Sequence, residues 1–359
     1  ATSSLDGTTR LWDLAQISPG EWSGAVGHAG ETVLDFSPTG PFLASGGQEG
    51  ELRYWNVENG NELFRLKNEE GGITSLEINQ SGSQAAVGFE SGRVLLVDLP
   101  SGRGADSLDG GQIIASISFS PDGDLVAAGT GDGSLWIWET DTGVNLGVWE
   151  LSDGFINGLA FSPDSEQLAA VSFTGDGQIL DVNELLAPDI EILQIISKDA
   201  VAVDFDSPTM PFTSVAWSPD GGRLVTTSWE GDLVIWDSKS GENISLVGGH
   251  QGQVREAEFS PDGARISSVG PDGSLIIWDA QTGERQYVLD EVEGGLRTLS
   301  FSPDGRYLAT GGTDGSVRVY VMPLEELMEL ARARLTRGLS EEECHRYLHL
   351  DGCPQGSES

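Results

Sequence analysis

Residues Gly249–Asp279 read GHQGQVREAEFSPDGARISSVGPDGSLIIWD, and this stretch decides the fold. A short apolar segment ends at Phe259, the turn sequence SPDG follows at 260–263, and an Asp-Gly pair at 272–273 precedes an apolar segment that ends at Trp278. Proline fixes φ at the second position of such a turn, and glycine accepts the positive φ that follows. The stretch therefore predicts short β-strands joined by tight turns.

The same unit recurs along the chain at nearly constant spacing. The residues that align with Trp278 are 41 to 43 residues apart, except for one interval of 56. They are Trp12, Trp55, Val97, Trp138, Leu180, Trp236, Trp278 and Tyr320. A period near 42 residues with four short strands per unit is typical of the blades of a β-propeller. Because one blade cannot bury both of its faces alone, we expect the blades to stack in a ring.

These repeats resemble the WD40 family over about residues 1–321. The resemblance implies an all-β fold, a seven-bladed WD40 propeller, with an eight-bladed ring as the alternative. We expect seven repeats within 20–321, with Glu21–Gly27 supplying the outer strand of the last blade. Residues 1–14 are then a partial repeat from a preceding blade or propeller.

The family also has a hydrogen-bonded His, Ser/Thr, Asp and Trp set that locks each blade. The resemblance places this lock on His250, Ser268, Asp272 and Trp278 in one repeat, and on His28, Ser45, Glu49 and Trp55 in another, with Glu49 where the family has Asp. Buried polar groups need partners, so we interpret both histidines as structural rather than catalytic.

After Pro323 the pattern becomes helical, with apolar residues such as Leu324, Leu327 and Met328 at helical spacing. We predict an α-helical C-terminal tail over 324–352. Its sequence resembles the ending that follows propellers in large bacterial signalling proteins, including STAND-type NTPases. That resemblance implies a cytoplasmic sensor or regulatory module of a larger protein. The alternatives are the regulatory part of an enzyme (an NTPase, kinase or protease) whose catalytic domain lies upstream, or a catalytic propeller.

The net charge and the absence of known motifs argue against several classes of function. The chain has 57 acidic and 19 basic residues, a formal net charge of −38, which repels nucleic-acid backbones. No apolar run approaches the roughly 20 residues that span a bilayer, so we expect no membrane association. The sequence lacks a P-loop, a zincin motif and a nucleophile elbow, and we expect no catalytic residues and no cofactor.

The two cysteines lie within a ten-residue segment that also holds two histidines, Cys344, His345, His349 and Cys353. The residues leave three possibilities open, which are free thiols, a disulfide and a zinc site. Free thiols are preferred because Cys344 and His345 are adjacent and point to different sides of the predicted helix. We therefore expect no metal site.

The top face of the ring is the predicted partner-binding surface. Seven positions align at its rim, namely Gln48, Glu90, Gly131, Gly175, Trp229, Pro271 and Thr313, and Trp229 stands out as the large aromatic residue among them. Four residues before the inner-strand aromatics come Asn157, Thr213, Arg255 and Arg297. We expect a docking patch in which Trp229 anchors a protein or peptide partner and the two arginines bind its carboxylates. The alternative is that the arginines only offset local acids.

The interval of 56 residues marks an insertion in the fifth unit. Ile190–Ile196 is predicted to form the outer strand of this blade. The extra residues at 197–211 would then lie in the loop that leads to the inner strand of the next unit, and this loop would open on the top face beside the predicted patch. The alternative is a surface insertion without a function.

Overall fold

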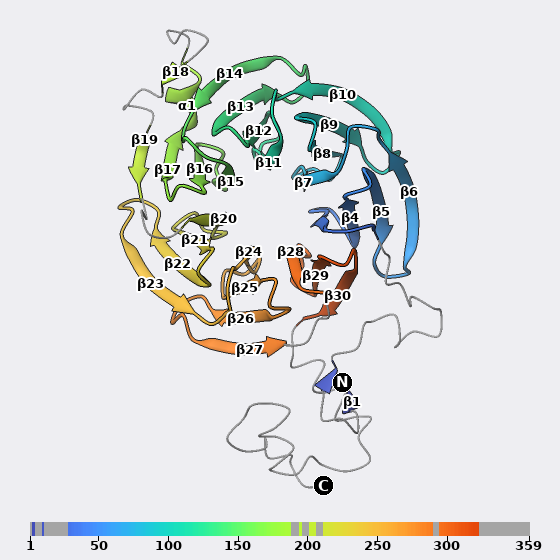
Figure 1. The fold of residues 1–359 in the computed structure, drawn as a ribbon, viewed down its shortest axis with the longest axis vertical. Helices are drawn as coiled ribbons and strands as arrows, with labels where there is room; N and C mark the ends of the chain where they lie inside the picture. Colours follow the sequence, from blue (N-terminus) through green and yellow to red (C-terminus); the bar gives the residue numbers. More distant parts are fainter. Residues whose placement is uncertain are drawn as a thin grey trace.

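The computed structural model describes residues 28–187, 194–195, 201–205, 211–289 and 294–322, together with two short strands, β1 (Thr2–Ser3) and β2 (Thr9–Arg10). These residues form a seven-bladed β-propeller in which seven sheets stand around a central opening (Figure 1). β1 and β2 pair with each other as a separate antiparallel hairpin. The expected helical tail at 324–352 and the closing strand at 21–27 lie outside the described residues.

Each blade is an antiparallel meander whose first strand lies at the centre of the ring. Blade I contains β3 (Thr32–Phe36), β4 (Phe42–Gly47), β5 (Glu51–Asn56) and β6 (Asn61–Lys67); blade II contains β7 (Ile73–Ile78), β8 (Gln84–Phe89), β9 (Arg93–Asp98) and β10 (Arg103–Asp109); blade III contains β11 (Ile114–Phe119), β12 (Leu125–Thr130), β13 (Ser134–Glu139) and β14 (Asn145–Glu150).

The remaining blades follow the same order. Blade IV contains β15 (Ile156–Phe161), β16 (Gln167–Ser172), β17 (Gly177–Asp181) and β19 (Val201–Asp204); blade V contains β20 (Phe212–Trp217), β21 (Arg223–Ser228), β22 (Asp232–Asp237) and β23 (Asn243–Gly248); blade VI contains β24 (Glu256–Phe259), β25 (Arg265–Val269), β26 (Leu275–Asp279) and β27 (Arg285–Leu289); blade VII contains β28 (Leu296–Phe301), β29 (Tyr307–Gly312) and β30 (Val317–Val321). Blade VII thus has three strands within the described part of the chain.

The hydrophobic core lies between neighbouring blades. Val94 and Leu96 of blade II, for example, pack against Ile114 and Trp138 of blade III. Blades I and VII, which are more than 220 residues apart in sequence, share a core in the same way, with Phe36 against Val319. Burial of apolar side chains on both faces of every sheet therefore closes the ring. No helix in the described part of the chain has the length and hydrophobicity to cross a bilayer.

Blade IV differs from the prediction. Its outer strand is β19, which pairs with β17 through Val203 and Ile179, and not a strand at 190–196. The segment β18 (Gln194–Ile195) instead pairs in parallel with the free edge of β14 in blade III. Val201 and Val203 occupy alternate positions of β19, and Phe205, directly after it, is buried against Trp236. Pairing with β17 and burial of Phe205 against Trp236 select 201–205 rather than 190–196.

The insertion consequently lies between β17 and β19, where the short helix α1 (Val182–Leu185) begins directly after β17. In an antiparallel meander, the connection from third to outer strand leaves from the same end as the connection from first to second strand. That end carries the SPDG-like turns and is opposite to the top face, which we define by the connections between second and third strands. The predicted position beside Trp229 is therefore wrong for the residues that precede β19, whereas Pro211, at the end of the predicted segment, does contact Trp229 through its carbonyl oxygen.

Candidate functional site: the mouth of the central cavity

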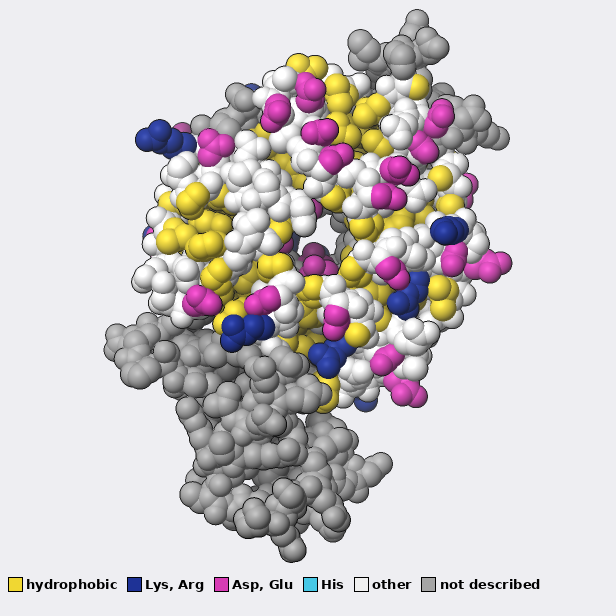
Figure 2. All heavy atoms as spheres, turned by 180° about the vertical axis from the view of Figure 1, so that it is seen from behind, with side chains coloured by type: hydrophobic (Ala, Val, Ile, Leu, Met, Phe, Trp, Pro, Cys, Tyr) yellow, Lys and Arg dark blue, Asp and Glu magenta, His cyan; other side chains and the backbone are white. Residues whose placement is uncertain are grey.

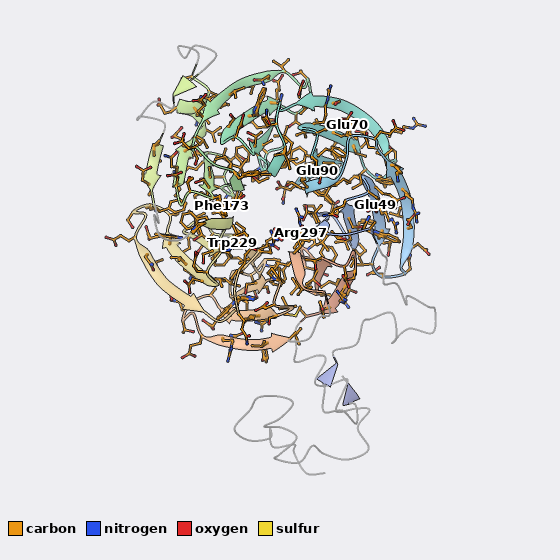
Figure 3. The ribbon with its side chains drawn as sticks, viewed as in Figure 1. Glu49, Glu70, Glu90, Phe173, Trp229 and Arg297 are labelled. Carbon is orange, nitrogen blue, oxygen red and sulfur yellow. The ribbon has the colours of Figure 1, made fainter. Side chains whose placement is uncertain are left out.

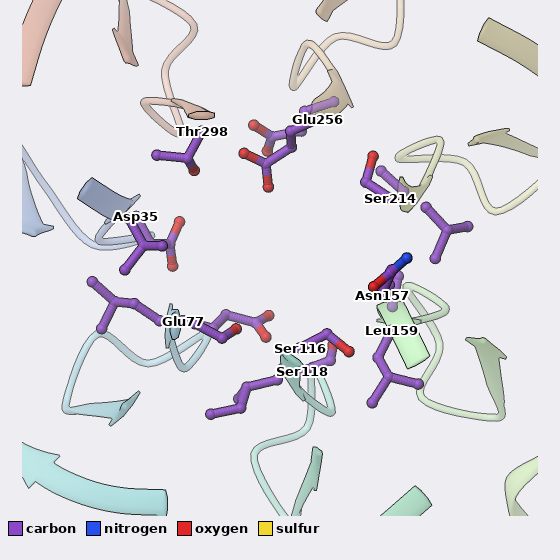
Figure 4. A pocket seen from close by; sticks show the side chains of 18 of the residues that line it. Asp35, Glu77, Ser116, Ser118, Asn157, Leu159, Ser214, Glu256 and Thr298 are labelled. Atoms are coloured by element: carbon purple, nitrogen blue, oxygen red, sulfur yellow. The ribbon is translucent and has the colours of Figure 1, made fainter. Parts of the chain in front are cut away.

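A cavity of about 750 Å³ occupies the centre of the ring. Inner strands of the blades line it, and Figure 4 shows Asp35, Glu77 and Glu256 pointing into it together with hydroxyl and amide side chains. Viewed from behind, the ring is open at its centre and acidic side chains are visible inside the opening (Figure 2). The site is described below from the depth of this cavity to its mouth.

Four half-buried carboxylates lie within the cavity, on Asp35, Glu77, Glu256 and Glu258. Burial raises the pKa of Asp35 to about 7, although hydrogen bonds from the Ile78 N–H and the Ser300 hydroxyl oppose the shift. Burial also raises the pKa of the other three, and Asp35 contributes to the shift at Glu77 and Glu258 by charge repulsion. Carboxylates with raised pKa values often occur in catalytic sites. The hydrogen-bond partners of these four side chains show whether their role is catalytic or structural.

The carboxylates serve as connections between blades. In five blades the residue before the last position of the inner strand accepts a backbone N–H from the next blade. The pairs are Asp35 with Ile78 (2.7 Å), Glu77 with Phe119 (2.9 Å), Ser118 with Phe161 (3.3 Å), Glu258 with Phe301 (3.2 Å) and Ser300 with Phe36 (3.1 Å). Glu256, two positions earlier, accepts from Leu299 at 2.8 Å. A buried backbone N–H without an acceptor would destabilise the fold. These carboxylates therefore have a structural role, which is to accept such N–H groups and join neighbouring blades.

The two blades without such an acceptor use a different contact. Blades IV and V carry Ala160 and Ala216 at this position. From blade V, the indole N–H of Trp217 donates to the Ala160 carbonyl oxygen of blade IV at 2.8 Å, and Ser214 Oγ of blade V accepts the Ala257 N–H of blade VI at 3.3 Å.

The predicted lock residues are joined by hydrogen bonds in both repeats. His250 contacts Asp272 through Nδ1 (3.1 Å) and Ser268 Oγ through Nε2 (2.8 Å), and the Trp278 indole donates to the same Ser268 oxygen at 2.9 Å. In blade I, His28 contacts Glu49 (2.7 Å) and Ser45 (2.9 Å), and Trp55 donates to Ser45 at 3.1 Å. Glu49 thus makes the contact that Asp272 makes in blade VI.

His28, Glu49 and Glu51 lie close enough together to resemble a metal-binding cluster. Both ring nitrogens of His28 are engaged by Glu49 and Ser45, and Glu51 forms ion pairs with Arg53 at 2.5 Å and Arg65 at 3.5 Å. These partners account for the three side chains without an ion. The Cys344–Cys353 segment lies outside the described residues.

Three aromatic rings line the cavity mouth on the top face. Phe155, Phe173 and Trp229 are 45%, 43% and 48% exposed, and all three border the cavity. Phe173 and Trp229 meet edge to face with centroids 5.7 Å apart, and the Phe173 N–H donates to the Phe155 carbonyl oxygen at 2.9 Å. Figure 3 shows Phe173 and Trp229 side by side at one edge of the opening. We call these three residues the aromatic wall.

The sequence prediction found Trp229 but missed the two phenylalanines. Phe173 and Trp229 each lie seven residues before the Trp-like residue of their third strand, Leu180 and Trp236, so Phe173 and not Gly175 occupies the aligned rim position. A correct count would have found Phe173. Phe155 precedes its inner strand, and only its backbone contact with Phe173 reveals its place in the wall.

The polar residues of the predicted patch have different roles. The Asn157 amide donates to the Phe212 carbonyl oxygen (2.8 Å) and the Thr213 hydroxyl to the Val254 carbonyl oxygen (2.5 Å), so both connect neighbouring blades. Arg297 donates to Glu31 and, at 3.0 Å, to the Thr74 carbonyl oxygen. Arg255 also borders the cavity, but its side chain makes no hydrogen bond with another described residue.

Comparisons with known proteins agree with this architecture. The family model "WD domain, G-beta repeat" matches residues 23–56, 106–139, 202–237, 241–279 and 283–320. WD repeat-containing protein SL1-17 of Schistosoma mansoni is 26% identical over 203 residues, which is 56% of this chain and 62% of that protein. Small ribosomal subunit protein RACK1y of Oryza sativa subsp. japonica is 27% identical over 220 residues, 60% of this chain and 51% of that protein.

A third relative is Periodic tryptophan protein 2 homolog of Dictyostelium discoideum, 24% identical over 250 residues, 66% of this chain and 26% of that protein. The matches span less than two thirds of the length of these relatives. The family model covers half of the chain and its matches fall on the repeats that form the blades. The chain therefore belongs to the WD40 family of β-propeller repeat proteins.

Proposed function

We propose that this propeller is a non-catalytic protein-interaction module, and that a segment of a partner protein docks across the cavity mouth against the aromatic wall. The observation that carries the proposal is the contiguous exposure of Phe155, Phe173 and Trp229 beside a cavity. Large aromatic side chains supply much of the binding energy in protein interfaces, since they bury wide apolar areas at small entropic cost.

The rigidity of the mouth supports the same conclusion. The Trp229 backbone N–H donates to the Pro211 carbonyl oxygen at 3.0 Å, and Phe173 is held by Phe155. Residues fixed in this way lose little entropy when a partner binds, so the wall is suited to an extended peptide with one bulky apolar residue. Two related proteins are named as parts of assemblies, one as a small ribosomal subunit protein and one as a subunit of eukaryotic translation initiation factor 3. These names favour an interaction role for this chain as well.

The test is a random-peptide display selection on the purified chain. The affinity of the selected peptides is then measured for wild type, Trp229→Ala, Phe173→Ala and a matched control, Ile244→Ala. Ile244 is 52% exposed but lies on the outer strand β23, away from the cavity. We expect at least a tenfold loss of affinity in the two wall variants, the size of an interface hot spot, and no change in the control. Full binding by Trp229→Ala with loss in Ile244→Ala would contradict the proposal.

We further propose that the propeller is a cytoplasmic regulatory module of a larger bacterial signalling protein. The helical pattern after Pro323 and its resemblance to the endings of such proteins support this context. The relatives named above are eukaryotic, so the support comes from the tail alone. Sequencing the coding region upstream of residue 1 tests it. An effector domain such as an NTPase, kinase or protease is expected there, and a stop codon with no such domain would contradict it.

A further inference from the structure

Beside the aromatic wall, the mouth carries two arginines and one glutamate. Arg297 donates through Nη1 to Glu31 and through Nη2 to the Thr74 carbonyl oxygen. Arg255 has only a loose ion contact, with its Nη2 3.9 Å from Glu31 Oε1, and its Nε is enclosed without a partner. Its side chain is about two thirds buried, being 33% exposed.

The two arginines of this cluster are not equally paired with carboxylates. One carboxylate, Glu31, faces two guanidinium groups, and Arg297 holds the nearer position. Burial lowers the pKa of Arg255, and the charge of Arg297 lowers it further, while Glu31 opposes the shift. Arg297 also lowers the pKa of Glu256 deeper in the cavity, so it has a second acidic neighbour that Arg255 lacks. Arg255 therefore has only the more distant Glu31 carboxylate as an acidic partner, in a chain whose net charge is −38.

The backbone at Arg255 lies beside the backbone at Trp229. The Val254 N–H, one residue before Arg255, donates to the carbonyl oxygen of Ser228, one residue before Trp229, at 3.0 Å. This backbone hydrogen bond joins blades V and VI and brings residues 228–229 and 254–255 together at the rim. Both side chains border the same cavity.

We infer that Arg255 is an anion-binding position, and that the docked partner segment carries a carboxylate a few residues from its apolar anchor. A half-buried guanidinium without hydrogen bonds is unfavourable, and a carboxylate supplies the charge-assisted, two-pronged contact that it lacks. The inference rests on the docking proposed above and specifies the chemistry of the partner.

The depth of the cavity determines what kind of anion fits. Asp35, Glu77, Glu256 and Glu258 lie below the mouth and repel further negative charge. A segment with one carboxylate at the rim avoids these acids, whereas a polyanion such as a nucleic acid would meet them and the negative field of the whole chain. The expected partner is thus an apolar peptide with a single acidic group, supplied by an aspartate or glutamate side chain or by a chain terminus.

Arrays of synthetic nine-residue peptides provide the test. Each peptide holds one Trp or Leu, with Asp one to four residues away, and is acetylated and amidated. Matched peptides carry Asn or Lys in place of Asp, and a further arm ends in a free carboxylate instead. Binding is measured for wild type, Arg255→Gln, Glu31→Gln and Trp229→Ala. Preference for the Asp arm identifies a side-chain carboxylate, and preference for the free-terminus arm identifies a chain end.

We expect wild type to prefer carboxylate peptides over the Asn peptides by about tenfold, the effect of one charge-assisted hydrogen bond. Arg255→Gln should abolish this preference while retaining binding of the Asn peptides. Glu31→Gln should increase it, because the competing carboxylate of the protein is removed. An equal response of wild type to the Asp, Asn and free-terminus peptides, or a preference for Lys, would overturn the inference.

Failure of the docking proposal gives a different result. Trp229→Ala is expected to lose the Asp, Asn and Lys peptides alike, since the apolar anchor is common to all. If Trp229→Ala binds every peptide as wild type does, the proposed docking surface is refuted, and the inference about Arg255 with it. If Trp229→Ala loses binding but Arg255→Gln keeps the carboxylate preference, only the inference is refuted.

Discussion

Asp35 allows a sharp test of how the carboxylates connect the blades. It accepts hydrogen bonds from the Ile78 N–H of blade II at 2.7 Å and from the Ser300 hydroxyl of blade VII at 3.0 Å, and so contacts the blades on both sides of its own. Its pKa is raised from 3.8 to about 7, chiefly by burial. The substitution Asp35→Asn keeps the shape and one acceptor oxygen but removes the titration.

The raised pKa of Asp35 gives the sign and the size of its effect on the free energy of unfolding as pH changes. Between pH 3.8 and 7 the folded chain binds a proton at Asp35 that the unfolded chain has released, so this group makes the fold less stable as pH rises through that window. Each pKa unit corresponds to about 1.4 kcal/mol. Because Asp35 borders a cavity and is not fully enclosed, we reduce the full value and expect about 1–2 kcal/mol between pH 5 and pH 8.

Urea unfolding followed by tryptophan fluorescence at pH 5, 6, 7 and 8 measures the difference between the two proteins. We expect Asp35→Asn to gain stability relative to wild type as pH rises. Glu77, Glu256 and Glu258 have raised pKa values too, but they are present in both proteins. The control is Asp262→Asn, because hydrogen bonds from Ser260 and the Ala264 N–H lower the pKa of Asp262 and no titration falls in this range. Parallel curves for wild type and Asp35→Asn would refute the reasoning.

Other predictions concern the lock and the turns. Ser268→Ala removes the oxygen shared by His250 and Trp278 and should cost about 2–4 kcal/mol in unfolding free energy, whereas its buried neighbour Ser267, whose hydroxyl has no partner, should tolerate alanine with a change within about 1 kcal/mol. Equal effects of the two substitutions would show that the lock does not stabilise the blade. Gly133→Ala should lower the melting temperature far more than Gly123→Ala. Both glycines have positive φ, but a Cβ at Gly133 would lie 1.8 Å from the Ser152 carbonyl oxygen, while Gly123 has open space. Similar melting temperatures for these two variants would contradict the close approach at Gly133.

Much of the fold could be predicted because the repeat carries it locally. SPDG-like turns, Asp-Gly pairs and apolar strands such as 275–278 recur in register, and each repeat has the same need to bury both faces. Blade IV was the exception, since two apolar segments, at 190–196 and 201–205, competed for one strand position. Pairing of Val203 with Ile179 and burial of Phe205 decided between them, and both depend on contacts between distant residues.

The candidate site was only partly predictable for the same reason. The exposure of Trp229 follows from its aligned rim position, and Phe173 could have been found in the same way. The different roles of Arg255 and Arg297 could not, because Glu31 and Thr74 lie more than 180 residues from either arginine and reach them only when the ring closes. The channel acids likewise look unremarkable in sequence, since each finds its partner on the next blade.

Amide hydrogen exchange of the chain with and without a display-selected peptide tests the central claim most directly, since it locates the contact without any substitution. The account predicts that protection on binding is concentrated in the segments that carry Phe155, Phe173, Trp229 and Arg255 around the cavity mouth. Protection confined to the outer strands or to the SPDG-like turns on the opposite face would contradict it.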